Sequence, residues 1–234
     1  MKTLHLIPVG LSQAPIQEWL PTHSRQMAAQ LDLYIAENAK TARAFLKLVE
    51  PQKAIRDITI HTLSKSTQPS EVKQWLQAVP SDGAIGLVSE AGCPAVADPG
   101  AIVVSQAQRL NFKVRPHVGP NSILLGLMAS GLDGQRFAFH GYAPIKPHER
   151  TQQLKQWESD SHKLQQTQIF IETPYRNQAM LETLISSLKP DTRLCVARDL
   201  TGPQELIQTY TVAQWRQQSL PDLNKLATLF LFLA

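Results

Sequence analysis

Short apolar runs alternate along this chain with stretches whose apolar residues recur every three or four positions. Apolar runs predict buried strands, and the spaced pattern predicts helices with one buried face. In the first half, the sequence predicts strands at residues 3–9, 33–37, 57–63, 84–89 and 112–116. Helices are predicted at residues 16–31 (interrupted by Pro21), 41–48, 71–79 (with Ser70 as N-cap) and 102–110. Strands that alternate with helices are typical of a mostly parallel α/β sheet.

The second half continues this alternation in a less regular order. Strands are predicted at residues 136–141, 168–172, 193–198 and 226–233. Helices are predicted at residues 123–130 (closed by Gly131), at 149–157, from Thr173-Pro174 onward, and at 211–217. We therefore expect an α/β protein with two domains, residues 1–117 and 118–234, that contain mostly parallel or mixed sheets.

Composition narrows the class of protein. Of the 234 residues, 43% are hydrophobic and 18% are charged, which excludes general disorder. No apolar run is long enough to span a membrane, and the first residues lack a signal-peptide pattern. The two cysteines have no metal-ligand spacing, so we expect no metal, and they make no disulfide framework, so we expect a cytoplasmic protein. A net charge of +4 is compatible with an RNA partner but does not establish one.

The most informative segment reads LVSEAGCPAVADPG, at residues 87–100. It leaves an apolar strand and forms a loop with two glycines and two prolines before the next helix. Open α/β sheets bind ligands at this end of a strand, and glycines let the backbone approach a ligand closely. Asp98 would then cap the following helix or bind a ribose hydroxyl. The alternative is a purely structural connection between strand and helix.

Two further loops carry the same two interpretations. Pro8-Val9-Gly10 follows the first strand, as an ordinary turn or as a ligand-binding loop. Gly119-Pro120-Asn121-Ser122 opens a helix, whose free N–H groups cap locally or bind a polar ligand.

Charged residues near strand ends are the other candidates. Glu37, Lys40 and Arg43 follow a strand and would bind a phosphate or orient a hydroxyl, unless they are only the solvated start of a helix. Glu172 ends an apolar strand and Arg176 follows one turn later, either as a structural ion pair or as part of a cleft.

Two more segments carry positive charge. Arg198 at a strand end is suited to bind an anion. The loop between His140 and His148 contains Tyr142 and Lys146; it would contact RNA through charge and stacking, or be a plain solvated loop.

These segments, in this order, resemble motifs of the tetrapyrrole methylase superfamily, and within it the ribosomal RNA 2′-O-ribose methyltransferases. The matching stretches are LVSEAGCPAVADPG, GPNS, IETPYR and ARDLT. The resemblance implies two α/β domains, S-adenosylmethionine (SAM) in the cleft between them, and a homodimer. The sequence departs from those enzymes at Asn38, which replaces an Asp, and at Gly202, which replaces a Lys. It also ends at Ala234 without their helical extension.

The resemblance also implies roles for individual residues. Glu37 and Glu172 are the candidate catalytic residues. Lys40, Arg43, Arg176 and Arg198 are the candidate substrate-binding residues. The candidate cofactor-binding residues are Pro8, Val9, Gly10, Ser89, Glu90, Ala91, Gly92, Cys93, Asp98, Pro99, Gly100, Asn121, Ser122, Ile123, Ile171 and Ala197.

Three functions follow from these expectations. The first is methylation of RNA, at a ribose hydroxyl of the small ribosomal subunit. The second is methylation of a small molecule such as a tetrapyrrole, which the absent extension favours. The third is a SAM-binding relative without catalysis, which the departures at Asn38 and Gly202 motivate. Alignment of the acceptor with the activated methyl group would supply much of the rate in either reaction.

Overall fold

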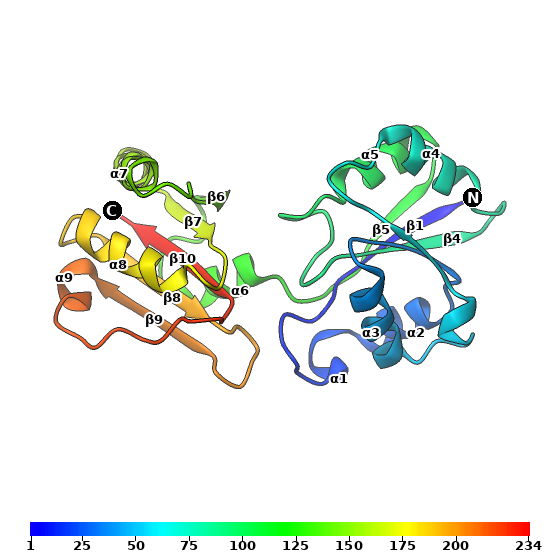
Figure 1. Cartoon of the computed structure of the whole chain (residues 1–234), viewed down its shortest axis with the longest axis horizontal. Coiled ribbons are helices and arrows are strands. Elements are labelled where there is room, and N and C mark those ends of the chain that lie inside the picture. Colours follow the sequence, from blue (N-terminus) through cyan, green and yellow to red (C-terminus); the bar gives the residue numbers. More distant parts are fainter. The chain divides into compact units, whose positions relative to one another are not determined.

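The computed structural model describes all residues from 1 to 234 and contains two compact units, Met1–Asn121 and Ser122–Ala234. Each unit contains one five-stranded sheet with helices packed on it. The division between the units lies just after the position between residues 117 and 118 that the sequence pattern suggests. Figure 1 shows both units coloured along the chain.

The first unit contains a fully parallel sheet. Its strands are β1 (Thr3–Ile7), β2 (Leu33–Ala36), β3 (Thr59–Thr62), β4 (Ala84–Val88) and β5 (Lys113–Pro116). They lie in the order β3-β2-β4-β1-β5, and every neighbouring pair is parallel. The apolar runs of β2 and β4 are buried almost throughout because helices cover both faces of the sheet.

The helices of this unit form two layers. They are α1 (Ile16–Trp19), α2 (Thr22–Ala29), α3 (Ala39–Val49), α4 (Pro69–Gln77) and α5 (Ala101–Arg109), with a 3-10 turn at Ile55–Asp57. Residues of α1, α2 and α3 share a core with Ile7 and Val88, whereas α4 and α5 share a core with Ile85 and Leu87. Figure 1 shows α4 and α5 on one side of the sheet and α2 and α3 on the other.

The order of the strands creates a natural ligand site. The chain leaves β2 toward β3 and leaves β4 toward β5, in the opposite direction. Neighbouring strands whose connections diverge in this way open a crevice at their carboxyl ends, where open α/β sheets bind ligands. The segments that follow β2 and β4 contain Glu37 and the loop at residues 89–100.

Two sequence expectations for this unit are corrected. The helix predicted at residues 16–31 is two helices, because Leu20 is extended and Pro21 starts a new helix at Thr22. Ser70 does not cap α4. The N-cap is Gln68, whose backbone N–H donates to Glu71 Oε2 over 2.8 Å, and Pro69 occupies the first helical position.

The second unit contains a mixed sheet. Its strands are β6 (Phe137–Tyr142), β7 (Thr167–Ile171), β8 (Arg193–Arg198), β9 (Leu206–Thr211) and β10 (Thr228–Leu233). Their order is β6-β7-β10-β8-β9. Only β6 and β7 are parallel, and the other three pairs are antiparallel.

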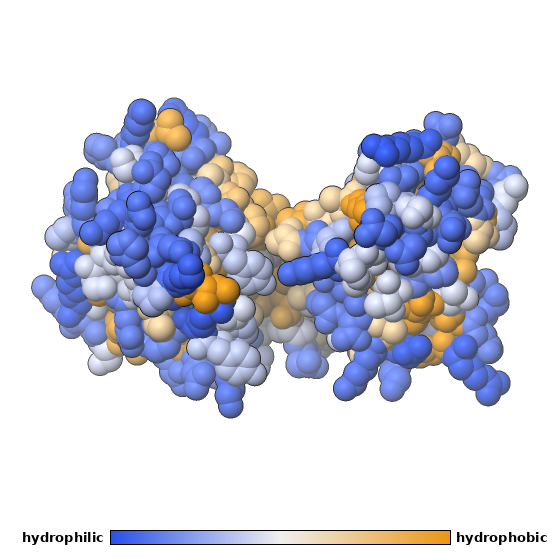
Figure 2. Space-filling view, turned by 45° about the horizontal axis from the view of Figure 1, so that its top comes forward, coloured by the Kyte–Doolittle hydropathy of each residue, from blue (hydrophilic) through white to orange (hydrophobic).

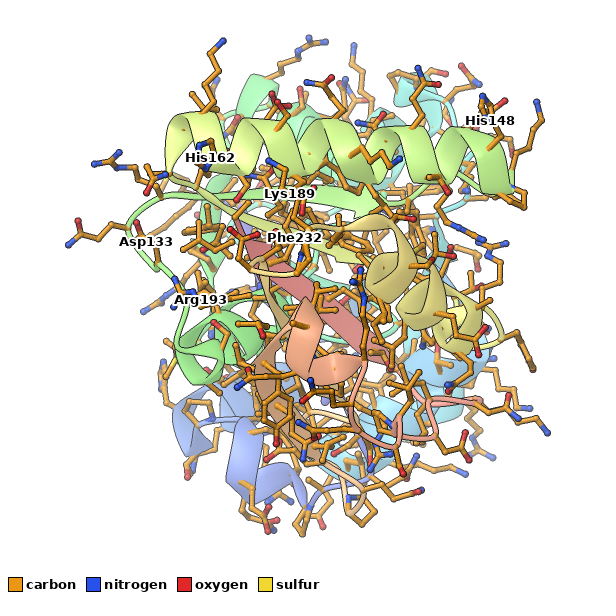
Figure 3. All side chains as sticks on the ribbon, turned by 90° about the vertical axis from the view of Figure 1, so that its left-hand side faces the viewer. Asp133, His148, His162, Lys189, Arg193 and Phe232 are labelled. Atoms are coloured by element: carbon orange, nitrogen blue, oxygen red, sulfur yellow. The ribbon has the colours of Figure 1, made fainter.

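Helices cover both faces of this sheet as well. They are α6 (Ser122–Ser130), α7 (Pro147–Leu164), α8 (Asn177–Ser187) and α9 (Val212–Trp215). The α7, α8 and α9 helices share a core with Phe230 and Phe232 of β10. In Figure 3, α7 crosses the view with His148 and His162 near its two ends, and Phe232 lies beneath it. On the other face α6 lies so close to β10 that a Cβ atom on Gly126 would collide with Leu229.

Three sequence expectations for the second unit are corrected. Strand β9 was not predicted, although it pairs with the whole of β8. The helix predicted at residues 149–157 extends from Pro147 to Leu164. The helix predicted to start at Thr173-Pro174 starts at Asn177, because residues 174–176 form a turn in which Arg176 N donates to Thr173 O.

Candidate functional site

Three loops predicted to bind a ligand meet in the first unit. Val9 and Gly92 exchange two backbone hydrogen bonds of 2.9 Å, which join the loop after β1 to the loop after β4. The Cys93 thiol donates to the carbonyl oxygen of Pro120 over 3.5 Å, which adds the third segment. Gly119 packs so closely on Pro8 that any side chain at position 119 would collide with the proline ring.

The loop at residues 89–100 has a constrained backbone. Ser89 Oγ donates to the carbonyl oxygens of Ala91 and Gly92, over 3.3 and 3.1 Å. Ala95 and Ala97 have φ angles of 67° and 63°, a conformation that costs an alanine roughly 1–2 kcal/mol. Strain of this kind clusters at functional sites, where the surrounding structure maintains it. The loop ends at Pro99 and Gly100, from which α5 begins.

Two carboxyl groups meet at the crevice between β2 and β4. Glu37 follows β2, Asp98 lies in the loop after β4, and their side chains share a hydrogen bond. The Oε1 atom of Glu37 is buried without a hydrogen-bond partner. A buried carboxylate oxygen without a partner is costly, so it marks a position where a ligand donor would be favourable.

Burial makes both groups weak acids. Desolvation, followed by the nearby charges of Asp98 and Glu90, raises the pKa of Glu37 to about 7. Desolvation and Glu90 also raise the pKa of Asp98 to about 6, although its hydrogen bond with Glu37 acts in the opposite direction. A pKa near neutrality suits a group that accepts a proton at physiological pH.

A small hollow opens beside this pair. Its lining includes Glu37, Asp98, Ser89 and Leu63. The side chains pack closely here, so the hollow marks the position of the crevice and is not a formed cavity.

The start of α3 stands next to the crevice. Asn38 caps this helix by accepting a hydrogen bond from Lys40 N over 2.9 Å. Thr41 Oγ1 donates to Glu90 Oε1 over 2.5 Å, which holds the exposed Glu90 carboxylate against the helix. The side chains of Lys40 and Arg43 are exposed on the first turns of α3. The structure thus brings Glu37, Glu90 and Asp98 together and leaves the two cations in solvent.

In the second unit, Glu172 and Arg176 form a buried ion pair. Arg176 Nη2 donates to Glu172 Oε1 over 2.5 Å, and Thr173 N donates to the same oxygen over 2.7 Å. The Glu172 side chain is fully buried and its Oε2 atom has no partner, whereas the Arg176 side chain is 33% exposed. The hydrogen bond to Glu172 raises the pKa of the Arg176 guanidinium, which therefore stays charged near neutrality.

The remaining candidates lie at the ends of strands or at the start of α6. Arg198 is committed to backbone oxygens, since it donates to Gln204 O over 3.1 Å and to Asp222 O over 2.8 Å. Ala197 is buried beneath Gly126 of α6, and Ile171 is half-buried at the end of β7. Asn121 is the last residue of the first unit, and Ser122 and Ile123 open α6 in the second.

Sequence reasoning missed two features of the site. The first is the strained pair Ala95 and Ala97, since alanine carries no signal for a positive φ. The second is Thr41, which binds Glu90. The signal was available in the sequence, because Thr41 lies on the first turn of a predicted helix beside the candidate charged residues.

The structure contains no helix with the length and apolar character of a membrane span. It also contains no group of three His, Cys, Asp or Glu residues that could bind a metal ion.

Several curated relatives of this chain share the same name. The "Ribosomal RNA small subunit methyltransferase I" of Neisseria meningitidis serogroup B is 35% identical over 135 residues, which are 57% of this chain and 45% of that protein. The Bacillus subtilis protein of the same name is 27% identical over 214 residues, or 92% of this chain and 69% of that protein. The first of these alignments thus spans about half the length of the relative. No family model matches the sequence.

Solved structures supply the fold. The methyltransferase CobJ superposes with a TM-score of 0.61 at 16% identity, covering 99% of this chain and 93% of that one. The cobalt precorrin-4 methyltransferase CbiF gives a TM-score of 0.59 at 14% identity, with 99% and 94% coverage. The chain therefore has the fold of these methyltransferases. This two-sheet α/β fold agrees with the expected fold class.

Proposed function

We propose that this chain is a SAM-dependent methyltransferase that acts on RNA of the small ribosomal subunit. The names of the curated relatives support the reaction and the substrate. The observation that carries the proposal is the crevice between β2 and β4. There the half-buried Glu37, whose Oε1 atom has no hydrogen-bond partner, lies together with Asp98 and the strained loop after β4.

The residues around the crevice fit a nucleoside cofactor. The closely packed loops at Pro8–Gly10 and 89–100 offer backbone groups, and Asp98 offers a carboxylate for a ribose hydroxyl. Bound SAM would supply a methyl group activated by a sulfonium. We propose that the loops after β1 and β4, together with Asn121, hold the cofactor.

We propose Glu37 as the group that takes the proton of the acceptor hydroxyl. Its pKa near 7 and its unpartnered Oε1 suit this role, and Asp98 would hold the carboxyl group in place. Glu172 suits it less, because its Oε1 already binds Arg176 and the whole side chain is buried. In the proposed reaction Glu37 would receive the proton that the acceptor hydroxyl loses when it takes the methyl group from bound SAM.

Lys40, Arg43, Arg176 and Arg198 are the proposed RNA contacts. Lys40 and Arg43 are exposed cations next to Glu37, where they would bind phosphate groups of the RNA. Arg198 already satisfies two backbone oxygens, so its role would be to shape the second unit as much as to contact RNA.

Transfer of a labelled methyl group tests the function. Small ribosomal subunits from cells that lack this gene are incubated with the wild-type protein and SAM labelled in its methyl group. We expect label in the ribosomal RNA, and about a hundred-fold slower transfer for Glu37→Gln because the proton acceptor is lost. Glu18→Gln, an exposed acid on α1, is the matched control and should retain full activity. Label in a tetrapyrrole but not in the subunits would replace the RNA proposal with a small-molecule one.

We also propose a homodimer that acts in the cytoplasm. Light scattering of the purified protein should give about twice the chain mass of 26.0 kDa. The proposed substrate places the enzyme where ribosomes assemble.

A further inference from the structure

Two tyrosine side chains are exposed at one edge of the second sheet. Tyr142 ends β6 and is 59% exposed, and Tyr175 follows β7 and is 80% exposed. Because β6 and β7 are parallel and Tyr142 pairs with Ile171, both tyrosines lie at the carboxyl ends of these strands. Neither tyrosine hydroxyl makes a hydrogen bond within the chain. Figure 2 shows, for one face, hydrophilic side chains interspersed with apolar areas on both units. Among the exposed large apolar side chains, Tyr142 and Tyr175 are the two most exposed aromatic rings.

The backbone is shaped to expose Tyr142. The pairing of β6 with β7 is irregular between Phe139 and Tyr142. Gly141, within this irregular segment, has a φ angle of 69°, which glycine adopts without strain. Irregularities of this kind change the direction of the side chains that follow and are common next to functional sites.

A positive charge is held beside the two rings. Arg176 follows Tyr175 directly and lies in the neighbourhood of Tyr142. The buried Glu172 carboxylate accepts from one guanidinium nitrogen, Arg176 Nη2, and one third of the Arg176 side chain is exposed. Lys225, which is exposed, donates its backbone N–H to Pro174 O and so places a second cation in the adjoining loop. Glu172 thus acts as a positioning residue for the guanidinium.

We propose that Tyr142, Tyr175 and Arg176 form a binding surface for single-stranded RNA. The two phenol rings stack with unpaired bases, and the guanidinium contacts a backbone phosphate. Stacking on exposed aromatic side chains next to cations is how proteins hold single-stranded nucleic acid. The inference rests on the proposed RNA substrate and adds where on the chain the RNA binds.

Fluorescence anisotropy with a labelled, unstructured RNA of about twelve nucleotides tests this surface in the full chain. Tyr142→Ala and Tyr175→Ala should each raise the Kd about ten-fold. Tyr142→Phe and Tyr175→Phe keep the ring and should bind like the wild type. Phe137→Ala is the matched control, because this 39% exposed aromatic residue lies at the opposite end of β6. The melting temperatures of all variants should match the wild type within a few degrees, since exposed positions contribute little to stability.

The outcomes separate this inference from the proposed function. Methyl transfer by the wild type with unchanged RNA affinity of both alanine variants overturns the surface and leaves the function intact. Alanine variants that change the mass of the protein in light scattering but not its RNA affinity would assign the tyrosines to contacts between copies, and would also overturn it. If the phenylalanine variants lose affinity as the alanine variants do, ring stacking is wrong.

Discussion

We expect Glu37 to affect the stability of the protein as well as the proposed reaction. Its pKa in the folded chain is raised to about 7 from an ordinary value of 4.5, so the folded state holds this proton more tightly than the unfolded state does. The free energy of unfolding therefore falls as the pH rises from 4.5 to about 7. Glu37→Gln removes the penalty, and we expect it to be more stable than the wild type at pH 8 by about 1 kcal/mol, allowing for solvent screening.

Thermal unfolding at two pH values checks this prediction. The variant should melt a few degrees above the wild type at pH 8 and close to it at pH 4, where both proteins carry a neutral group at this position. An equal difference at both pH values would mean that packing, rather than ionisation, separates the two proteins.

The ion pair of Glu172 and Arg176 is the second prediction at the scale of single residues. Glu172→Ala leaves the guanidinium and Thr173 N without their acceptor in a buried place, so we expect a loss of about 2–3 kcal/mol. Lys146→Ala breaks the exposed pair with Glu149 and should cost less than about 0.5 kcal/mol. Urea unfolding of the two variants gives both values. Similar losses for both would show that burial does not strengthen the first pair.

At the scale of elements, the contact of α6 with β10 depends on one missing side chain. Gly126→Ala would improve helix propensity by about 1 kcal/mol, but its new methyl group collides with Leu229. We expect a net destabilisation of about 1–2 kcal/mol, measured by urea unfolding, because well-packed cores resist added volume.

A second substitution tests the cause. Leu229→Ala in the same chain should make Gly126→Ala neutral or stabilising, since the colliding atoms are gone. Gly134→Ala is the control, because nothing lies within 4 Å of its added Cβ. Additive losses in the double variant would contradict the collision.

The sequence predicts most elements and fewer of their limits. Apolar runs such as residues 84–89 and the stripe that contains Leu181 identify a buried strand and a helix directly. Strand β9 escaped because its Gln and Thr residues interrupt the apolar pattern, and its half-exposed positions gain their order from pairing with β8. The predicted start of α8 was wrong, although Thr173-Pro174 is typical of a helix start. In the structure Thr173 N donates to the Glu172 carboxylate, and a turn separates these residues from the helix.

The site itself was predictable as separate segments and not as an arrangement. Glu37 and Asp98 were both candidates, on the strength of strand ends and family motifs. Their hydrogen bond depends on β2 and β4 being neighbours in the sheet. The local pattern of apolar and polar residues does not determine the order of the strands. The shifted pKa values also follow from burial, which only the folded chain reveals.

At the scale of the whole molecule, each unit has cores of its own. Phe230→Ala removes a ring from the core of the second unit and should destabilise that unit by about 3–5 kcal/mol. Hydrogen exchange should accelerate in β7, β8 and β10 and stay unchanged in β1, β2 and β4. Acceleration in all six strands would show that the two units unfold together.

The position of β10 in the second sheet has a consequence for synthesis of the chain. This strand is the last of the unit to leave the ribosome, yet it occupies the centre of the sheet between β7 and β8. The first unit has all its strands once β5 has emerged and is able to fold early, as N-terminal domains generally do. Until β10 is synthesised, the facing edges of β7 and β8 stay unpaired, and unpaired edges pair readily with other chains. The nascent second unit therefore needs rapid completion of β10 or a chaperone to avoid aggregation.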